Sequence, residues 1–478
     1  MARYDMVLRG GRVVDPASGL DAVCDLGIRQ GRVAAVTDRL PDEQTADLID
    51  VSGRVVIPGI IDTHVHIGGL RGEEHAAGHR MVAETGVTTC LDMGSPMGPF
   101  LEGVRRHGVG LNVAALFPVQ PPHTIPTQDP SAAEIRRALE QQIRQGAFGL
   151  KLFGGHLPLT PDATARGIEV ANDLGCYVAY HLGTTESSSN LTGLRELPAL
   201  LGRHHVHLAH VSAYLRGMIL PDPIDECREA LDLLRRFRDQ IISESYLSSR
   251  IGTGNATYGD CHGEDVEDKV TQNCLRMGGY PLTREGLRRA MRDGYAFVYA
   301  QVGPRVVMVR GEEAVARWEA AGTRCTVGFP VTPVLSSVQT TIAQESDGAF
   351  VVDAIATDGG AIPRNFLVER GLALVRLGAL TLADYVRKVS YNPSRMLGLT
   401  DKGHFGEGAD ADVTVLDLDR GKATLSLVAG EPVLVEGRVV GRGGRLLTTP
   451  AGAEAAQESG LPYQVVDLSR SWLYRRSA

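Results

Sequence analysis

Histidine, lysine and aspartate recur in or at the ends of short apolar segments, and these are the residue types of metal-dependent hydrolysis. His64 and His66 close the segment PGIIDTHVH. Residues two apart on a strand point the same way, so both imidazoles can reach one metal ion. A single His-x-His motif is weak evidence for a metal site, because buried histidines satisfied by hydrogen bonds are common. The order of the candidate residues that follow along the chain strengthens the case for a metal site.

Lys151 lies inside the apolar segment FGLKLF. A lysine in a buried strand is costly unless its charge is paired or removed. One interpretation is a lysine whose alkyl chain runs to solvent at a strand end. The other is a neutral amine that CO₂ has carboxylated. Its oxygens would then bridge two metal ions, and hard oxygen with imidazole suits zinc, manganese or similar ions.

Three further candidates close strand-like segments: His181 ends CYVAYH, His210 ends HVHLAH and Asp358 ends VVDAIATD. In a barrel of parallel strands the C-terminal strand ends converge on one face, where catalytic groups gather. We expect His207 to lie one layer deeper, in the core or behind the ligands. Considered by itself, Asp358 would be interpreted as a turn residue before two glycines. Considered together with the histidines and Lys151, it can bind metal and accept a proton from an attacking water.

The segment that positions these residues runs from about 58 to 399. It alternates β-branched apolar runs with amphipathic stretches such as SAAEIRRALEQQIRQG. We predict an α/β fold, a (β/α)₈ TIM-like barrel. Its seventh strand is either DQIISESYL near 240 or AFVYAQV near 299. Residues 215–345 exceed one barrel unit, so we predict an insertion there, of the kind that forms lids or binding loops.

The two ends of the chain have a different sequence pattern from the middle. Residues 1–57 and 400–450 carry short apolar runs separated by Gly, Asp and Pro, which is typical of antiparallel strands and turns. We predict that both ends form one composite β-sandwich domain. Residues 451–478 form a C-terminal extension whose packing the sequence leaves open.

Charge and composition exclude several classes of partner. The net charge is −8 and no basic run is present, which argues against nucleic acid or an anionic membrane surface. No apolar stretch reaches the roughly 18 residues of a membrane span. The chain starts without an apolar leader, and its 7 cysteines are scattered without C-x-x-C spacing. We therefore expect a cytoplasmic protein without disulfides.

Several motifs together resemble the amidohydrolase superfamily, in particular its hydantoinase, dihydroorotase and deacylase branch. The resemblance covers nearly the whole chain. It rests on the segments PGIIDTHVH, GVTTCLDMGS, GLKLF, AHVS, ATDGG, NPSRMLGL and GEGADADVTVLD.

The resemblance implies a binuclear centre with two divalent metal ions, zinc first, bridged by a hydroxide and by a carboxylate that CO₂ forms on lysine. It also implies a homodimer or homotetramer. The implied ligands are His64, His66 and Asp358 on the first ion, His181 and His210 on the second, and Lys151 on both.

Two positions depart from the branch. Dihydroorotases carry an arginine two residues after the second histidine, where this chain has Gly68. Hydantoinases carry a tyrosine five residues after the bridging lysine, where this chain has His156. We predict that His156 replaces that tyrosine as a catalytic oxyanion donor, because Gly154 and Gly155 let the backbone come close. A surface loop histidine is the alternative.

Three residues are predicted to bind substrate. Arg364, six positions after Asp358, can hold a substrate carboxylate through two hydrogen bonds, although an arginine at a helix start is an equal reading. Asn190 ends the run SSSN and either lines the pocket or makes a turn before the next helix. Gly155 lies beside His156 and is expected to leave room for substrate.

The predicted activity is hydrolysis of an amide-type C–N bond other than an ordinary peptide bond. Cyclic amides and imides are the first substrate class. The alternatives are N-acyl amino acids, peptide-like natural products and esters, so the partner is a small molecule or a short peptide-like substrate. A non-catalytic scaffold is disfavoured because every ligand position holds a competent side chain. A mononuclear deaminase is disfavoured because one metal needs no bridging lysine.

Overall fold

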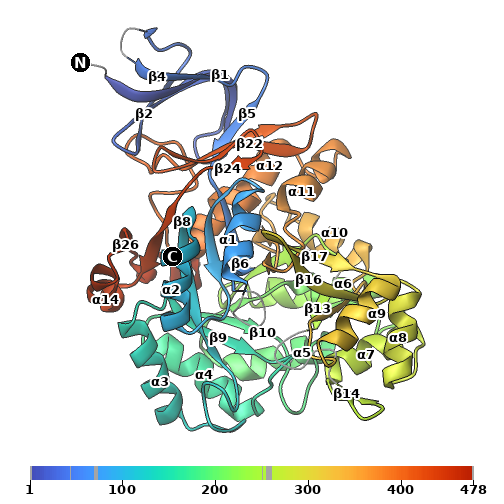
Figure 1. Ribbon diagram of the computed structural model, residues 1–478. Helices are drawn as coiled ribbons and strands as arrows, with labels where there is room; N and C mark the ends of the chain where they lie inside the picture. Colours follow the sequence, from blue (N-terminus) through green and yellow to red (C-terminus); the bar gives the residue numbers. More distant parts are fainter. Residues whose placement is uncertain (1–2, 43–44, 69–73, 250, 254–260, 476–478) are drawn as a thin grey trace.

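The computed structural model describes residues 3–42, 45–68, 74–249, 251–253 and 261–475, and it contains a barrel, an added β domain and an extra α/β segment (Figure 1). The barrel strands pair in parallel in the order β6 to β12 and then β19, and β20 returns to β6. The predicted TIM-like barrel is confirmed. Its strands are β6 (Ile60–His66), β7 (Val87–Asp92), β8 (Val109–Val119), β9 (Gly149–Phe153), β10 (Tyr177–His181), β11 (Val206–Leu208), β12 (Ile241–Tyr246), β19 (Ala354–Ala356) and β20 (Gly359–Gly360).

Amphipathic helices surround these strands. In α3, Ile135, Leu139 and Ile143 recur every four residues and are buried, while Ser131 and Glu134 close a capping box at its start. The helices of the barrel are α1 (His75–Ala83), α2 (Met97–His107), α3 (Ala132–Arg144), α4 (Pro161–Asp173), α5 (Leu191–Leu201), α6 (Pro223–Arg236), α10 (Val334–Ile342), α11 (Leu367–Arg376), α12 (Leu382–Val386) and α13 (Asn392–Met396). None of the described helices is both long and apolar enough to span a bilayer.

Strands from both ends of the chain meet in one nine-stranded sheet, which Figure 1 shows at the top of the molecule. β21 pairs antiparallel with β5, which joins the late strands to the early ones. The sheet holds β1 (Tyr4–Asp15), β2 (Leu20–Arg29), β3 (Arg32–Thr37), β4 (Thr45–Asp50), β5 (Val55–Pro58), β21 (Val413–Asp417), β22 (Lys422–Val428), β23 (Glu431–Val435) and β24 (Arg438–Val439).

The seventh strand of the barrel is β12, which carries the sequence IISESY between β11 and β19. The other candidate, β16 (Phe297–Val302), belongs to a separate four-stranded sheet with β13 (Ile251–Thr253), β18 (Val327–Phe329) and β17 (Arg305–Val309). The extra segment therefore begins after β12 rather than at 215, since α6 and β12 are barrel elements. Its other elements are β14 (Cys261–His262), β15 (Asp265–Val266), α7 (Lys269–Gly278), α8 (Arg284–Arg292) and α9 (Gly311–Ala320). Residues 250 and 254–260 of the predicted insertion lie outside the described residues.

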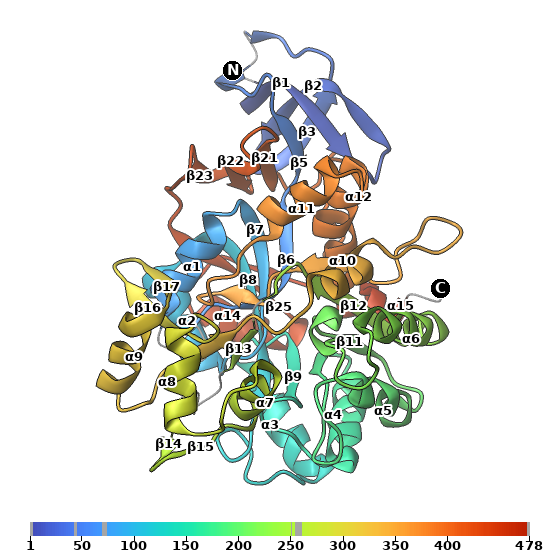
Figure 2. The same ribbon diagram turned by 90° about the vertical axis from the view of Figure 1, so that its right-hand side faces the viewer.

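The C-terminal segment packs on the barrel of its own chain (Figure 2). β25 (Gly443–Thr448) pairs in parallel with β8, and β26 (Tyr463–Val465) pairs with β25. Residues 443–448 were expected in the composite β domain, but they pair with β8 and belong to the barrel sheet. The segment also holds α14 (Ala453–Glu458) and α15 (Trp472–Arg475).

Candidate metal centre

The end of β6 and the turn after β19 bring three metal-binding side chains together. Nε2 of His64 lies 3.3 Å from Oδ1 of Asp358, and Nε2 of His66 lies 3.1 Å from the same oxygen. One ligand atom from each residue falls within 4.8 Å of the others, and all three residues are buried. This is the set that the sequence analysis assigned to the first metal ion.

Two of the predicted ligands have left-handed backbone conformations, which are uncommon for residues other than glycine. The φ angle is 30° at His210 and 51° at Asp358. The backbone N–H of Asp358 donates to the carbonyl of His64 at 2.9 Å, which holds the turn against β6. Such strain is found at functional sites, where the surrounding structure fixes it.

A second group of imidazoles lies beside the first. The ring centroids of His181 and His210 are 4.5 Å apart, and those of His64 and His210 are 5.0 Å apart. Nε2 of His181 is 2.8 Å from Oγ of Ser189. Among the described residues, Nδ1 of His210 has no hydrogen-bond partner although it is buried. A buried nitrogen without a partner fits a group that receives a ligand.

Lys151 is 1% exposed in the middle of β9. Its Nζ lies 3.2 Å from Sδ of Met93 and 5.7 Å from the ring centroid of Phe153. No described carboxylate lies within ion-pair distance of this amine. Burial lowers the pKa of Lys151 to about 8, against the raising effect of Glu244 and Asp358. The charge of Lys151 acts on His64, His181 and His210, so a lysine with a lowered pKa lies near both groups of imidazoles.

Glu244 on β12 is a functional residue that the sequence analysis missed. Its Oε1 is 2.5 Å from Nδ1 of His64 and accepts the backbone N–H of His210 at 3.1 Å. Its Oε2 accepts the hydroxyl of Thr63 at 2.6 Å and lies 3.4 Å from Nε2 of His207. One buried carboxylate therefore orients His64 from behind and holds the turn that carries His210. The expected place of His207 behind the ligands agrees with these contacts.

Burial sets the protonation of the centre. It lowers the pKa of His64 to about 4 and those of His181 and His210 well below the ordinary value. Burial alone would raise the pKa of Glu244, but His64 and His207 hold it well below its usual range. A neutral His64 that donates its Nδ1 proton to ionised Glu244 keeps Nε2 free, which is the form that binds metal.

The donor set fits a pair of divalent ions. Imidazole nitrogens and a carboxylate are borderline and hard ligands that zinc accepts. Nδ1 of His210 has no hydrogen-bond partner among the described residues, and the buried amine of Lys151 contacts the sulfur of Met93 and no described carboxylate, so both are available to such ions. His64, His66, Asp358, His181, His210 and Lys151 all line one pocket of about 660 Å³.

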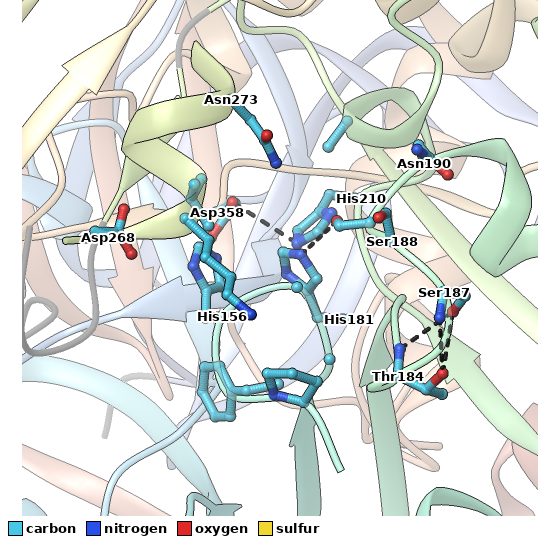
Figure 3. A pocket seen from close by; sticks show the side chains of 18 of the residues that line it. His156, His181, Thr184, Ser187, Ser188, Asn190, His210, Asp268, Asn273 and Asp358 are labelled. Atoms are coloured by element: carbon cyan, nitrogen blue, oxygen red, sulfur yellow. Dashed lines mark hydrogen bonds and ion pairs between the residues drawn. The ribbon is translucent and has the colours of Figure 1, made fainter. Parts of the chain in front are cut away.

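The predicted substrate-binding residues lie around the same pocket but make different contacts. Arg364 is 5% exposed and places Nη2 at 2.5 Å from Oδ2 of Asp358, and its Nε donates to the Asp358 carbonyl. It therefore orients Asp358, and its role as a clamp for a substrate carboxylate stays a prediction. Oδ1 of Asn190 caps α5 by accepting the N–H and hydroxyl of Thr192. Asn190 still lies at the pocket wall (Figure 3).

His156 and Gly155 follow β9 and lie against His181. The rings of His156 and His181 are 4.8 Å apart and edge to face. Burial, more than the neighbouring charges, lowers the pKa of His156 to about 4. Figure 3 shows His156 and His181 close to each other in the pocket. The surface-loop alternative for His156 does not agree with this position, while its catalytic role stays a prediction.

Replacing Gly155 with alanine is expected to weaken binding at the second metal position by about 10- to 100-fold, as disturbing the surroundings of a ligand commonly does. A Cβ at position 155 would lie 2.4 Å from Nε2 of His181 and 2.7 Å from Cβ of Ser189. Metal titration of the chelator-treated protein measures the effect. Gly98→Ala is the control, because its Cβ would meet nothing within 4 Å. Equal affinities in the two variants would contradict the prediction.

Comparison with known proteins agrees with this geometry. A model of the amidohydrolase family matches residues 334–441. A dihydroorotase of Streptococcus pneumoniae is 22% identical over 418 residues, which cover 86% of this chain and 90% of that protein. An allantoinase of Deinococcus radiodurans is 26% identical over 431 residues, which cover 87% of each. These matches support the amidohydrolase superfamily for this chain.

Solved structures of known proteins agree with the fold. An N-acyl-D-glutamate deacylase from Bordetella bronchiseptica, crystallised with zinc and a phosphonate inhibitor, superposes with a TM-score of 0.66. It is 18% identical, and the match covers 93% of this chain and 99% of that one. The predicted resemblance to the superfamily is confirmed by the family model and the relatives, and the barrel and the added β domain are confirmed by the fold.

Proposed function

We propose that this amidohydrolase hydrolyses the amide-type C–N bond of a cyclic amide or imide. The observation that carries the proposal is the convergence of two imidazole groups, a buried lysine and an aspartate on one pocket at the C-terminal ends of the barrel strands. The dihydroorotase and allantoinase relatives, which match 86–87% of the chain, support a cyclic amide as the first candidate.

We propose that the ligands bind two divalent ions. His64, His66 and Asp358 would hold the first, and His181 and His210 the second. We propose that Lys151 is carboxylated and ligates both, because its buried amine has no carboxylate partner among the described residues. Zinc is the first candidate, as in the Bordetella deacylase structure. Bound ions of this kind polarise a carbonyl and acidify water.

Asp358 is suited to move the proton of the reaction. Its carboxylate faces the pocket and is 11% exposed, while Arg364 holds Oδ2 at 2.5 Å. Arg364 and the nearby histidines keep its pKa well below the ordinary value, in spite of the opposing effect of burial. The low pKa keeps Asp358 ionised, so it could accept a proton from an attacking water that the metal ions would acidify and pass it to the leaving nitrogen, with Arg364 fixing its orientation.

His156→Phe is expected to lower kcat by about 10²-fold, because removing one donor to the developing oxyanion commonly costs that much. The phenyl ring keeps the edge-to-face contact with His181, so metal content should stay at the wild-type level. Steady-state kinetics and metal analysis on the same preparations give the two readouts. An unchanged kcat would exclude the oxyanion role.

An N-acyl amino acid is the second candidate substrate. The pocket of about 660 Å³ is wider than one small ring requires, and α7 of the extra segment forms part of its wall. In Figure 3, Asp268, which caps α7, and Asn273 of α7 lie on the opposite side of the pocket from Thr184 and Ser187. Such a wall leaves room for an acyl chain or a side chain beyond the scissile bond.

The test compares both classes on one metal-loaded preparation. Dihydrouracil, hydantoin and allantoin represent cyclic substrates, and N-acetyl amino acids of both configurations represent acyclic ones. Turnover of the cyclic set supports the first candidate, and turnover of the acyclic set alone moves the assignment to the second. Full metal content without turnover of either set would contradict the proposal and favour a scaffold. A homodimer or homotetramer and a cytoplasmic location stay predictions.

A further inference from the structure

Arg216 is held in the pocket wall by a rigid backbone. It follows the short 3₁₀ helix Val211–Tyr214, which begins directly after the predicted ligand His210. On one side, the carbonyl of Leu215 accepts the buried hydroxyl of Ser336 at 2.6 Å. On the other side, the N–H of Gly217 donates to Oε2 of Glu226 at 2.8 Å.

Glu226 fixes the rest of this loop. Its side chain is fully buried on α6, and its Oε1 accepts the N–H groups of Ile219 and Leu220 at 2.8 and 3.1 Å. Three backbone N–H groups of the loop donate to this carboxylate and stabilise its charge, so it needs no arginine as a partner. Glu226 therefore builds the loop that carries Arg216 and leaves the guanidinium free.

The guanidinium of Arg216 has no ion-pair or hydrogen-bond partner among the residues that the structure describes, and its Nε is buried. The other arginine of the pocket, Arg364, is paired with Asp358. The positive charge of Arg216 contributes, after burial and other neighbours, to the lowered pKa of His156, which places it near the reaction centre. Burying an arginine nitrogen without a partner costs free energy that a bound anion would recover.

The acidic residues of the pocket do not supply that anion. Oδ2 of Asp268 caps α7 by accepting the N–H and hydroxyl of Thr271, each at 2.7 Å. Glu267 is exposed, so solvent screens its charge. Among the described residues, neither carboxylate forms an ion pair with Arg216, although all three residues line the pocket.

We propose that Arg216 binds a carboxylate of the substrate, so that the preferred substrates are amides that carry an acid group near the scissile bond. A guanidinium holds a carboxylate through two parallel hydrogen bonds, which fixes orientation as well as charge. This inference rests on the proposed amide hydrolysis, and it applies to cyclic and acyclic amides alike. It assigns the carboxylate clamp to Arg216 in place of the paired Arg364.

The test uses matched acid and carboxamide pairs. The panel contains N-acetyl amino acids with apolar, acidic and aromatic side chains in both configurations, dihydropyrimidine carboxylates, and the carboxamide of each. Binding is measured on the metal-loaded protein by calorimetry with N-methanesulfonyl amino acids and their carboxamides, whose sulfonamide is not hydrolysed. Arg216→Met keeps the length of the side chain, and Arg216→Lys keeps its charge. Arg203→Met removes one exposed positive charge outside the pocket as the control.

We expect at least one acid to bind 10-fold or more tightly than its carboxamide in the wild-type protein. Arg216→Met should reduce this ratio by about 10- to 100-fold, Arg216→Lys by less, and Arg203→Met should leave it unchanged. No acid preference in any wild-type pair, or a preference that survives Arg216→Met, would overturn the inference.

The two proposals fail separately. Acid binding through Arg216 without hydrolysis of any amide would refute the proposed function and retain the anion site. Hydrolysis of amides without an acid preference would retain the function and refute the role of Arg216.

Discussion

Lys151→Ala is expected to reduce the metal content from about two ions per chain to one or none and to lower kcat by about 10³-fold or more. The variant removes the only side chain proposed to bind both ions, and the charge stabilisation that each ion supplies is worth several kcal/mol. Metal content is measured for both proteins after purification with bicarbonate and without chelators. Two ions retained in the variant would contradict a bridging lysine.

Lys388→Met provides a matched control for this experiment. Lys388 is also fully buried, and burial lowers its pKa to about 7. Its Nζ donates to the carbonyl of Val352 at 2.5 Å, and Lys388 does not line the pocket. The variant should lose stability and keep its metal content. Equal metal loss in both variants would point to general unfolding rather than to a lost ligand.

Glu244→Gln is expected to lower metal affinity by about 10- to 100-fold, because the carboxylate that orients His64 is lost. The amide also replaces a buried anion that Thr63, His64 and the N–H of His210 contact. Breaking such a buried set costs about 3–5 kcal/mol of the free energy of unfolding. Competition with a chelator gives the affinity, and denaturant unfolding of the metal-free protein gives the stability.

Glu226→Gln is a control that distinguishes the loss of metal affinity expected for Glu244→Gln from its loss of stability. Glu226 is an equally buried carboxylate, but its contacts are backbone N–H groups of the loop 217–220. Its loss should destabilise the protein and leave metal affinity near the wild-type value. If both variants bound metal equally well, His64 would not depend on Glu244 for its orientation.

The predicted ligands could be found from sequence because each obeys a local rule. His64 and His66 share a strand face at a spacing of two, and Lys151 is conspicuous as a charge within an apolar strand. Glu244 carries the same signal as Lys151, since it lies in the buried strand IISESY. The serines on both sides make that segment half polar, and the sequence offers a second candidate for the seventh strand near residue 299.

Contacts between distant segments had no such local signal. Glu244 meets His64 across the barrel, 180 positions away in sequence. The pairing of Arg364 with Asp358 depends on the left-handed turn at Asp358, which residue types alone do not predict. The free guanidinium of Arg216 depends on Glu226 being satisfied by backbone groups, and a sequence shows only two opposite charges ten positions apart.

The pairing of β5 with β21 has a consequence for how the chain folds as it is synthesised. Val55–Pro58 finds its partner in Val413–Leu416, which leaves the ribosome on the order of tens of seconds later. Until then, one edge of β5 has no partner, and β5 runs almost directly into the strand that carries His64. An open strand edge of this kind invites pairing with other chains. Nascent chains should therefore depend on chaperones, and fragments that end before residue 413 should aggregate although they contain every ligand of the metal centre.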